Sequence, residues 1–272
     1  MLRLLLAAAL IAAPAPAPPQ YQVYAVRYAT VPNFPLRGLV AGAPRDARTD
    51  LAMTLWVIRA PDGRVMLFDA GFYRDKFITQ WKPRDYVTPA QAVERLGITP
   101  GDVHDVVISH IHWDHADGAD LFPNAQVWLQ KDEYDYYVGA GGAPLHPAID
   151  SLDAQMLFTL NAEGRVSKIA GDSAEVFPGI RAYLGGKHTY ASEYLSVPTR
   201  SGTVILASDN VYLYENLDDH RPIAQTLDSL SNLAAQRRML ALASRPGLIV
   251  PGHDPAVFTR FPKVAEGIVR ID

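Results

Sequence analysis

The feature that most constrains this chain is a cluster of histidines and carboxylates directly after an apolar run. The run 106–108 predicts a short buried strand, and it leads into Ser109-His110-Ile111-His112-Trp113-Asp114-His115. His110 and His112 alternate along the backbone and can face one metal ion, whereas Asp114 and His115 lie past a turn and can face a second. Such ligands suit borderline-soft divalent metals, zinc first. Three of the eight histidines lie in this one hexapeptide, which favours a metal site over a polar loop.

Three further segments repeat the pattern of an apolar strand that ends in a metal-type ligand. His188 follows the glycine pair 185–186, Asp209 ends the run 204–208, and His253 follows the run 248–250 and a turn. Each residue alone is weak evidence, because a single His or Asp after a strand is usually structural. A dinuclear site needs about three donors in addition to the first cluster, at least one of them able to bridge the two ions. These three residues can supply them, so the four strand ends together predict one dinuclear site.

The order of these residues resembles that of the metallo-β-lactamase superfamily, over about residues 21–270. The resemblance implies two Zn²⁺ ions per chain, with Asp209 bridging them. It implies a first site made of His110, His112 and His188, and a second site made of Asp114, His115 and His253. Asp69, in Phe68-Asp69-Ala70-Gly71, matches the family's Asp-x-Gly loop, whose carboxylate supports the site by orienting metal-bound histidines. The alternative is that Asp69 merely begins a turn.

The segment Asp209-Asn210-Val211-Tyr212 resembles one branch of that superfamily, the zinc-dependent N-acyl-homoserine lactone lactonases. The resemblance implies a hydrolase that opens lactone rings, as in quorum quenching. Tyr212 would then contact the lactone carbonyl, and Asp114 would carry a proton to the leaving alkoxide. The alternative for Tyr212 is a tyrosine that packs beside the site. The family's usual Gly-His-Thr-Pro-Gly-His is replaced by Lys187-His188-Thr189-Tyr190-Ala191-Ser192, which keeps the histidine and loses the Pro-Gly turn.

Three other functions remain to be weighed. An exported metallo-β-lactamase would act on another cyclic acyl substrate, but Asp209 as a bridging ligand does not fit it. A glyoxalase II-like thioester hydrolase would share all seven ligands, but its glutathione substrate is mainly cytosolic. A metal-binding protein without activity is disfavoured by the intact ligand set. The related di-iron electron-transfer proteins carry a glutamate where His112 stands, which favours zinc.

Composition excludes several classes of partner and ligand. The 272-residue chain has a net charge of −4 and no run of basic residues, so we expect no nucleic-acid partner, since phosphate contacts need clustered Lys and Arg. It has no cysteine, so a metal site must be built from His and Asp. We expect a small-molecule lactone as the substrate.

The N-terminal residues 1–20 are typical of a signal peptide followed by an Ala/Pro leader. Arg3 precedes the ten-residue apolar run 4–13, and a proline-rich stretch follows. The run is too short to span a bilayer. We therefore expect a periplasmic or secreted protein with no stable membrane anchor.

The pattern of apolar runs and turns predicts an α/β fold. We expect one catalytic domain over 21–272, a four-layer αββα sandwich with two packed sheets between outer helices. The expected strands are 21–28, 51–60, 65–69, 104–108, 126–129, 180–184, 193–199 and 203–208. The expected helices are 89–96, 131–138, 226–243 and 262–269. In the third helix the expected core residues are Leu227, Leu230, Leu233, Ala234 and either Met239 or Leu240.

Other segments are expected to shape the pocket. The apolar segment 31–36 contains two prolines and does not look like a strand. It could wall a site for a hydrophobic substrate tail, or pack on the core or on the second subunit of a homodimer. At least one of Tyr134, Tyr136 and Tyr137 is expected to pack in a helix, and the others could line the entrance. Three histidines are expected to be surface or structural residues: His104, His146 and His220.

Overall fold

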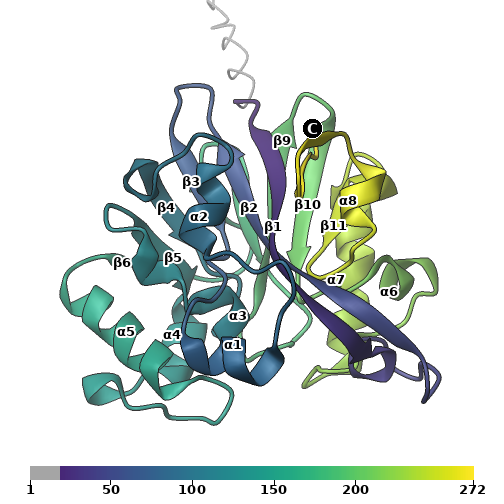
Figure 1. Ribbon diagram of the computed structural model, residues 1–272, viewed down its shortest axis with the longest axis horizontal. Coiled ribbons are helices and arrows are strands. Elements are labelled where there is room, and N and C mark those ends of the chain that lie inside the picture. Colours follow the sequence, from purple (N-terminus) through teal and green to yellow (C-terminus); the bar gives the residue numbers. More distant parts are fainter. Residues whose placement is uncertain (1–18) are drawn as a thin grey trace, which may run out of the picture.

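Two β-sheets packed face to face form the centre of the computed structural model, which describes residues 19–272 (Figure 1). The predicted leader, residues 1–20, thus lies almost wholly outside the described residues. The first sheet has the strand order β12-β13-β1-β2-β3-β4-β5-β6, and the second β11-β10-β9-β8-β7. The strands of the first sheet are β1 Gln22–Pro35, β2 Arg48–Arg59, β3 Val65–Phe68, β4 Val103–Val107, β5 Gln126–Gln130, β6 Val166–Ile169, β12 Lys263–Ala265 and β13 Ile268–Arg270. Those of the second are β7 Ala174–Phe177, β8 Ile180–Leu184, β9 Glu193–Thr199, β10 Gly202–Ser208 and β11 Ile249–Pro251.

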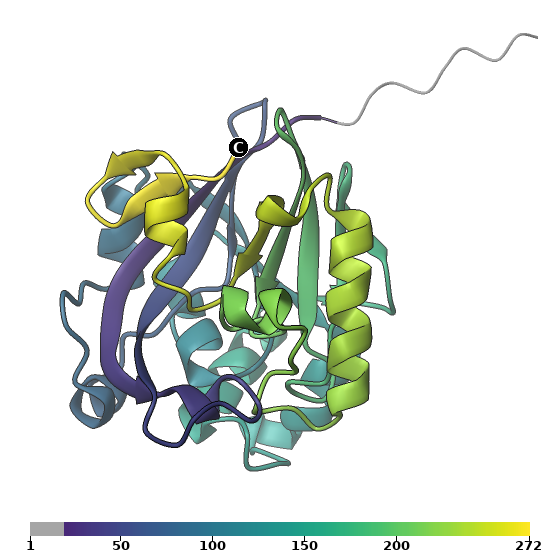
Figure 2. The ribbon, with the colours of Figure 1, turned by 90° about the vertical axis from the view of Figure 1, so that its right-hand side faces the viewer.

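Helices cover both outer faces of this pair of sheets. Figure 2 shows α7 standing alone against the outer face of the second sheet. Helices α2, α4 and α5 contact strands of the first sheet. The helices are α1 Asp75–Trp81, α2 Pro89–Glu94, α3 Trp113–Ala116, α4 Lys131–Tyr137, α5 Ser151–Ala162, α6 Tyr214–Asp218, α7 Ser229–Leu242 and α8 Val257–Arg260.

Side-chain alternation along the strands creates three apolar layers. In β10, Val204 and Leu206 belong to the cluster between the two sheets, whereas Ile205 and Ala207 belong to the cluster under α7. In β1, Val23 faces the other sheet and Tyr24 belongs to the cluster on the outer, helix-covered face. Because successive residues of a strand point to opposite faces, both sheets bury both sides. The predicted four-layer αββα sandwich is confirmed.

The strands that precede the predicted ligands deliver them to one edge of the sandwich. β3 and β4 are parallel in the first sheet, and β10 and β11 are parallel in the second. Two backbone hydrogen bonds join the sheets at this edge: Glu193 N donates to Ser109 O over 2.8 Å, and Ala52 N donates to His253 O over 2.9 Å. The loops that follow these strands therefore meet at one place.

The predicted terminal helix over 262–269 is wrong. The segment forms the antiparallel strands β12 and β13, joined by a turn in which Gly267 has a φ of +68°. β13 pairs with β1 and places Ile268 opposite Val26. Ile268 and Val269 are both buried, in different apolar layers. The free edge of β1 supplies the backbone partner, and such tertiary pairing outweighs local propensity.

Segment 31–36 also differs from its prediction, because β1 continues to Pro35. The pairing with β2 shifts register between Val31 and Phe34, where Asn33 has a φ of +58°. The other edge of β1 pairs with β13 only at residues 24–26. Prolines are tolerated at such a bulge beside an open edge.

Helix α7 exists as predicted, but its buried face is not the predicted leucine stripe. Leu227 and Leu230 are 69% and 78% exposed, and Ala234 and Leu240 are exposed too. The buried residues are Asn232, Ala235, Gln236 and Met239. Asn232 accepts a hydrogen bond from Ile223 N and donates one to Asn210 O, so polar groups dock this helix on two loops. A hydrophobic pattern cannot reveal that contact.

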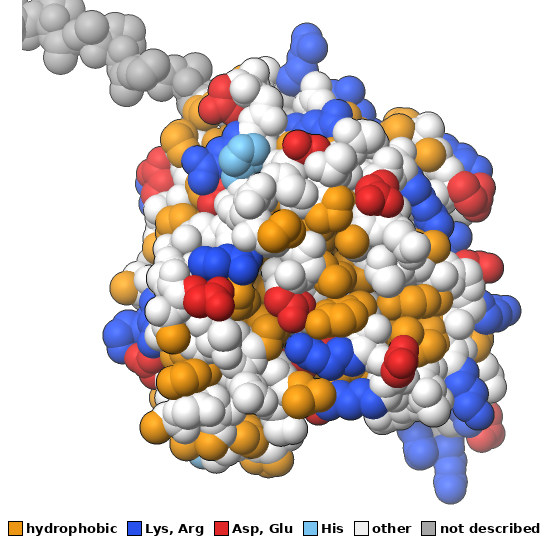
Figure 3. All heavy atoms as spheres, turned by 60° about the vertical axis from the view of Figure 1, so that its left-hand side comes forward, with side chains coloured by type: hydrophobic (Ala, Val, Ile, Leu, Met, Phe, Trp, Pro, Cys, Tyr) orange, Lys and Arg blue, Asp and Glu red, His pale blue; other side chains and the backbone are white. Residues whose placement is uncertain are grey.

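Two observations bear on larger partners. Figure 3 shows blue and red side chains interspersed among apolar and neutral ones, so the charges on this face do not form a continuous basic surface. Within residues 19–272, no helix combines the length and apolar character needed to cross a membrane.

The close approach of two loops beside the ligand cluster generates a prediction. Gly118 N donates to Gly71 O over 2.8 Å, and a Cβ on Gly118 would lie 2.3 Å from the carbonyl oxygen of Ala70. We expect Gly118→Ala to lower the free energy of unfolding by about 1–3 kcal/mol, because the backbones must separate. Gly247→Ala is the control, since a Cβ there meets nothing within 4 Å. Urea denaturation measures both, and equal stabilities would contradict the prediction.

Candidate metal centre

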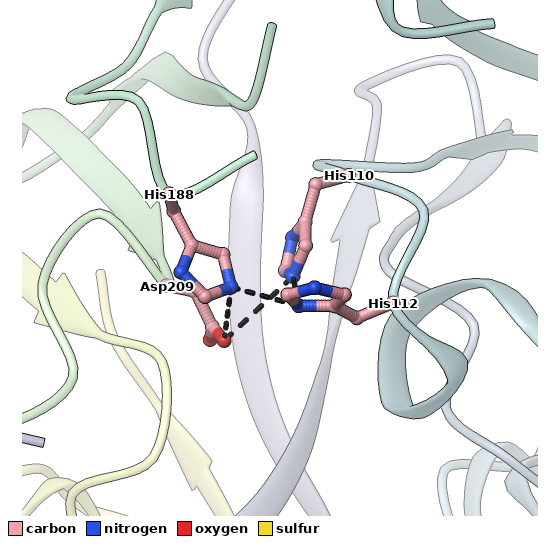
Figure 4. A group of neighbouring side chains, drawn as sticks. All are labelled: His110, His112, His188 and Asp209. Atoms are coloured by element: carbon pink, nitrogen blue, oxygen red, sulfur yellow. Dashed lines mark hydrogen bonds and ion pairs between the residues drawn. The ribbon is translucent and has the colours of Figure 1, made fainter. Parts of the chain in front are cut away.

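Four predicted ligands form one tight group between the two sheets. The donor atoms of His110, His112, His188 and Asp209 all lie within 4.8 Å of one another. His112 Nδ1 is 3.0 Å from His110 Nε2 and 2.8 Å from His188 Nε2. Figure 4 shows the three rings turned towards one another, with the carboxylate of Asp209 beside them. The structure thus assembles the predicted first site from three separate loops.

The other three predicted ligands form a second group beside the first. The donor atoms of Asp114, His115 and His253 also lie within 4.8 Å of one another. Asp114 Oδ2 is 3.6 Å from Nε2 of both His115 and His253. The three side chains come from α3 and from the loop after β11. The predicted second site is therefore also brought together.

Asp209 lies between the two groups and turns one oxygen to each. Its Oδ2 is 3.3 Å from His188 Nε2 and 3.7 Å from His110 Nε2. Its Oδ1 is 2.9 Å from His253 Nε2 and 3.2 Å from His115 Nε2. A carboxylate placed in this way can bind one metal ion through each oxygen.

The ring nitrogens on the far side of these histidines are held by oxygen atoms. His188 Nδ1 lies 2.7 Å from Gln225 O, and His253 Nδ1 lies 3.1 Å from Ala52 O. Backbone carbonyls only accept hydrogen bonds, so both Nδ1 atoms donate. In the neutral form of each ring, which is the form that binds a metal, Nε2 then presents a lone pair to the centre.

The protonation states of the first group suit metal binding. Burial lowers the pKa of His112 and of His188 to about 4, so both rings are neutral at pH 7. Burial also lowers the pKa of His110 well below its usual value. Neutral rings leave nitrogen lone pairs available to a metal ion at this point.

Charge in the second group favours a cation. Burial opposes a charge on His115, but the carboxylates of Asp209, Asp114 and Asp69 outweigh it and raise the pKa of this imidazole. His115 Nε2 and Asp209 Oδ1 are buried without a hydrogen-bond partner among the described residues. Buried polar atoms normally have partners, and bound ions are one way to supply them. The residues present fit a pair of metal ions.

Asp69 lies under both groups, as the resemblance implied. Its φ is +63°, which sets it in a strained turn directly after β3. Its Oδ2 accepts from His115 Nδ1 over 2.8 Å, and its Oδ1 accepts from Ser109 N over 2.8 Å. Asp69 therefore does more than begin a turn, because it holds a ligand ring and the strand end that carries the cluster.

The loop of His188 is built by close contacts that the sequence only partly signals. A Cβ on Gly185 would lie 1.9 Å from Asn210 Oδ1, and one on Gly186 would lie 2.3 Å from Asn232 Cα. Only glycine fits in this narrow passage, so the glycine pair delivers the chain to His188.

Sequence reasoning missed Glu133, a buried carboxylate of α4 that clamps both ligand loops. It accepts from Ile111 N over 3.2 Å, from Thr189 Oγ1 over 2.5 Å and from Ala191 N over 2.6 Å. These contacts hold the loop that lacks the family's Pro-Gly turn. The helical spacing of Glu133 and Tyr137, both buried, was the one available signal.

A cavity opens beside the two groups. It is lined by Val31, Phe34, Leu39, Leu51, Met53, Trp81, His112, Trp113, Asp114, Asp209, Tyr212, Gln225 and His253. The Tyr212 ring packs 5.6 Å from that of His188 and 5.8 Å from that of His253, measured between centroids. Tyr212 thus borders both ligand groups and the cavity.

The remaining tyrosines and histidines lie elsewhere. Tyr134 and Tyr137 are buried, and Tyr136 stacks between His146 and Tyr190, with ring centroids 3.8 and 4.0 Å away. The expectation that at least one of these tyrosines packs in a helix is confirmed, and none of the three is among the residues that line the cavity. His104, His146 and His220 lie outside both ligand groups, as predicted.

Sequence comparisons find N-acyl homoserine lactonases among the proteins similar to this chain. The chain is 28% identical over 189 residues to the N-acyl homoserine lactonase AiiA of Bacillus thuringiensis subsp. kurstaki, which covers 69% of this chain and 70% of that protein. It is 30% identical over 180 residues to the N-acyl homoserine lactonase AttM of Azorhizobium caulinodans, covering 63% and 65% of the two chains.

Solved structures share the fold. An N-acyl homoserine lactone hydrolase with N-hexanoyl-L-homoserine at its metal centre superposes with a TM-score of 0.73 at 19% identity, covering 91% of this chain and 98% of that one. The dizinc quorum-quenching lactonase AidC superposes with a TM-score of 0.67 at 14% identity, covering 88% and 89%. The sequence model of the metallo-beta-lactamase superfamily matches residues 49–253. With the histidine and aspartate cluster and the two-sheet fold, this match shows that the chain belongs to the metallo-beta-lactamase superfamily.

Proposed function

We propose that the chain is a dinuclear zinc hydrolase that opens the ring of N-acyl homoserine lactones. The observation that carries the proposal is the carboxylate of Asp209, which faces one ligand group with each oxygen beside an apolar cavity. In this proposal His110, His112 and His188 hold one zinc ion, and Asp114, His115 and His253 hold the other. The names of the similar lactonases support this substrate class.

The chemistry of ring opening assigns work to two residues of the cavity wall. When bound, a pair of zinc ions would supply a hydroxide nucleophile near neutral pH and would polarise a carbonyl. Tyr212 can donate its hydroxyl hydrogen to the lactone carbonyl oxygen as negative charge develops there. Asp114, whose side chain is 13% exposed, can pass a proton to the ring oxygen as the carbon–oxygen bond breaks. Lactone and water give a hydroxy acid, and no covalent enzyme intermediate is needed.

An aromatic wall suits the hydrophobic acyl tail of such a substrate. Trp81 and Trp113 stack with centroids 5.5 Å apart, and Phe34 lies 6.1 Å from Trp81. Val31 and Phe34, from the proline-containing half of β1, face the same cavity. These contacts support the wall expected from segment 31–36. The homodimer that the sequence leaves open stays a prediction.

The charge of the cavity distinguishes among the three candidate substrate classes. The described residues that line it include two aspartates but neither lysine nor arginine. Glutathione thioesters and β-lactam antibiotics carry carboxylates, which a binding site usually pairs with a cation. An N-acyl homoserine lactone has no charge, so this cavity favours it.

A substrate panel tests the proposed function directly. We expect zinc-loaded protein to open N-acyl homoserine lactones faster than it cleaves S-lactoylglutathione or nitrocefin, because no lysine or arginine lines the cavity to pair with the carboxylates of the other two substrates. Rates measured at equal enzyme and substrate concentrations decide the order. Faster cleavage of either anionic substrate would contradict the proposal.

The position of Asp209 between the two ligand groups predicts that its removal lowers the occupancy of both metal sites. We expect wild-type protein to hold two zinc ions after chelation and reloading, and Asp209→Ala to hold less than about one, because each group loses an oxygen ligand. Elemental analysis measures both. Asp132→Ala, at an exposed carboxylate of α4, is the control and should keep two ions. Two firmly bound ions in Asp209→Ala would show that this carboxylate does not bridge.

The variant Tyr212→Phe tests whether the Tyr212 hydroxyl donates a hydrogen bond to the substrate or whether the ring only packs beside the site. We expect kcat on lactones to fall by roughly tenfold, less than the ~10²-fold or more for a sole oxyanion donor, because a metal shares the task. The variant should keep both zinc ions, since Tyr212 is not a ligand. Unchanged kcat would make Tyr212 a bystander, whereas loss of zinc would make it structural.

We also propose that the protein is exported, on the strength of Arg3 followed by the apolar run 4–13. Mass spectrometry of the protein from the periplasm or medium should find a mature form that has lost these residues. A form in the cytoplasm that still begins near Met1 would refute export.

A further inference from the structure

A chain of hydrogen bonds beneath the metal centre connects the two ligand groups. Ser109 Oγ lies 2.9 Å from His110 Nδ1 and 2.8 Å from Ser208 Oγ. Ser208 Oγ lies 2.8 Å from Asp69 Oδ2, the same oxygen that contacts His115 Nδ1. A longer contact of 3.4 Å joins Ser208 Oγ to His115 Nδ1. All five residues are buried, so water does not compete for these bonds.

The carboxylate at one end fixes the direction of every bond in this chain. Asp69 only accepts, so the Ser208 hydroxyl donates to it and can accept from Ser109. The Ser109 hydroxyl then donates to Ser208, which leaves its oxygen free to accept from His110. His110 must therefore carry its hydrogen on Nδ1. The reverse order would set a hydroxyl lone pair against a carboxylate at 2.8 Å.

The direct partner of His110 does not by itself determine which ring nitrogen carries the hydrogen, so this chain of hydrogen bonds, the relay, has to determine it. His188 and His253 face backbone carbonyls, and His115 faces a carboxylate, so an oxygen that only accepts fixes each of these rings. His110 faces a hydroxyl, which can donate or accept. If Ser109 donated to Nδ1, the His110 hydrogen would move to Nε2, the atom that faces Asp209 and the first group.

The backbone at Ser208 indicates that its hydroxyl serves a purpose. Ser208 has a φ of +46°, a left-handed conformation that L side chains rarely adopt. Glycine would fit this backbone with less strain, yet a serine hydroxyl is placed there between Ser109 and Asp69.

We infer that Ser109 and Ser208 are positioning residues that transmit the charge of Asp69 to His110. One carboxylate then selects the metal-binding tautomer in both groups, directly at His115 and through two hydroxyls at His110. This inference rests on the proposed metal centre but not on the lactone substrate.

Nitrogen-15 NMR of the zinc-free protein tests the tautomer itself. In wild-type protein we expect the His110 hydrogen on Nδ1. Ser208→Gly removes the hydroxyl while suiting the backbone, and we expect a substantial fraction of His110 to shift its hydrogen to Nε2. His115 should stay unchanged, because its bond to Asp69 is direct. A His110 ring that keeps its hydrogen on Nδ1 in Ser208→Gly would overturn the relay.

Zinc titration against a competing chelator measures the consequence for metal binding. We expect Ser208→Gly to weaken one of the two zinc ions by about 10–100-fold, the usual cost of losing a partner behind a metal-bound histidine. Nitrogen-15 shifts of His112 and His253 during the titration assign the weakened ion, which should be the one at His112. The other ion should change less than about twofold. Two unchanged affinities would overturn the inference.

Matched variants separate the relay from general damage. Ser192→Ala removes another buried hydroxyl, which donates to Asn210 Oδ1 over 3.1 Å, and should leave both zinc affinities unchanged. Ser109→Ala should weaken the same ion as Ser208→Gly. The variant that combines both changes should bind zinc no more weakly than the single variant with the lower zinc affinity, because both changes break the same chain of hydrogen bonds. Additive losses would mean independent structural effects, and a wild type that binds fewer than two zinc ions would refute the metal centre instead.

Discussion

The crowding of buried ring nitrogens and one carboxylate around a single point is the constraint on which the rest of this structure depends. Nε2 of His188 and Nδ1 of His112 lie 2.8 Å apart, and burial keeps both rings neutral by lowering their pKa to about 4. At most one hydrogen can lie between two facing nitrogens, so a cation among the donors is the partner that would satisfy all of their lone pairs. On the other side of Asp209, its Oδ1 lies 2.9 Å from His253 Nε2 and 3.2 Å from His115 Nε2, where one cation could bind all three atoms. Metal binding and the geometry of these loops therefore depend on each other.

Rigid strands and short, tightly held loops keep these ligand side chains in position. The ligand loops follow strands of both sheets, and backbone hydrogen bonds such as Glu193 N to Ser109 O tie the sheets together at this edge. Glu133 accepts hydrogen bonds from the two loops of the first group, and Asp69 accepts one from His115 of the second group. Such supporting contacts limit how far a ligand can move and so favour a fixed metal geometry.

The sequence predicted the chemistry better than the packing. All seven proposed ligands meet because each follows a strand that ends at one edge, a rule that local patterns can reveal. Of the predicted core residues of helix α7, Met239 is buried, but the leucine stripe was wrong because the amides of Asn232 and Gln236 bury against loops instead. Helix α5 was not foreseen. The strand β13 replaced a predicted helix because its partner, β1, lies more than 200 residues away in the chain. Contacts of this range leave no local signal.

A crystal soaked with zinc and measured above the zinc absorption edge tests the central claim most directly. The account predicts two anomalous peaks, one on each side of the Asp209 carboxylate. One peak should lie among His110, His112 and His188, and the other among Asp114, His115 and His253. A single peak at this edge of the sandwich, or two peaks that do not share Asp209, would contradict it.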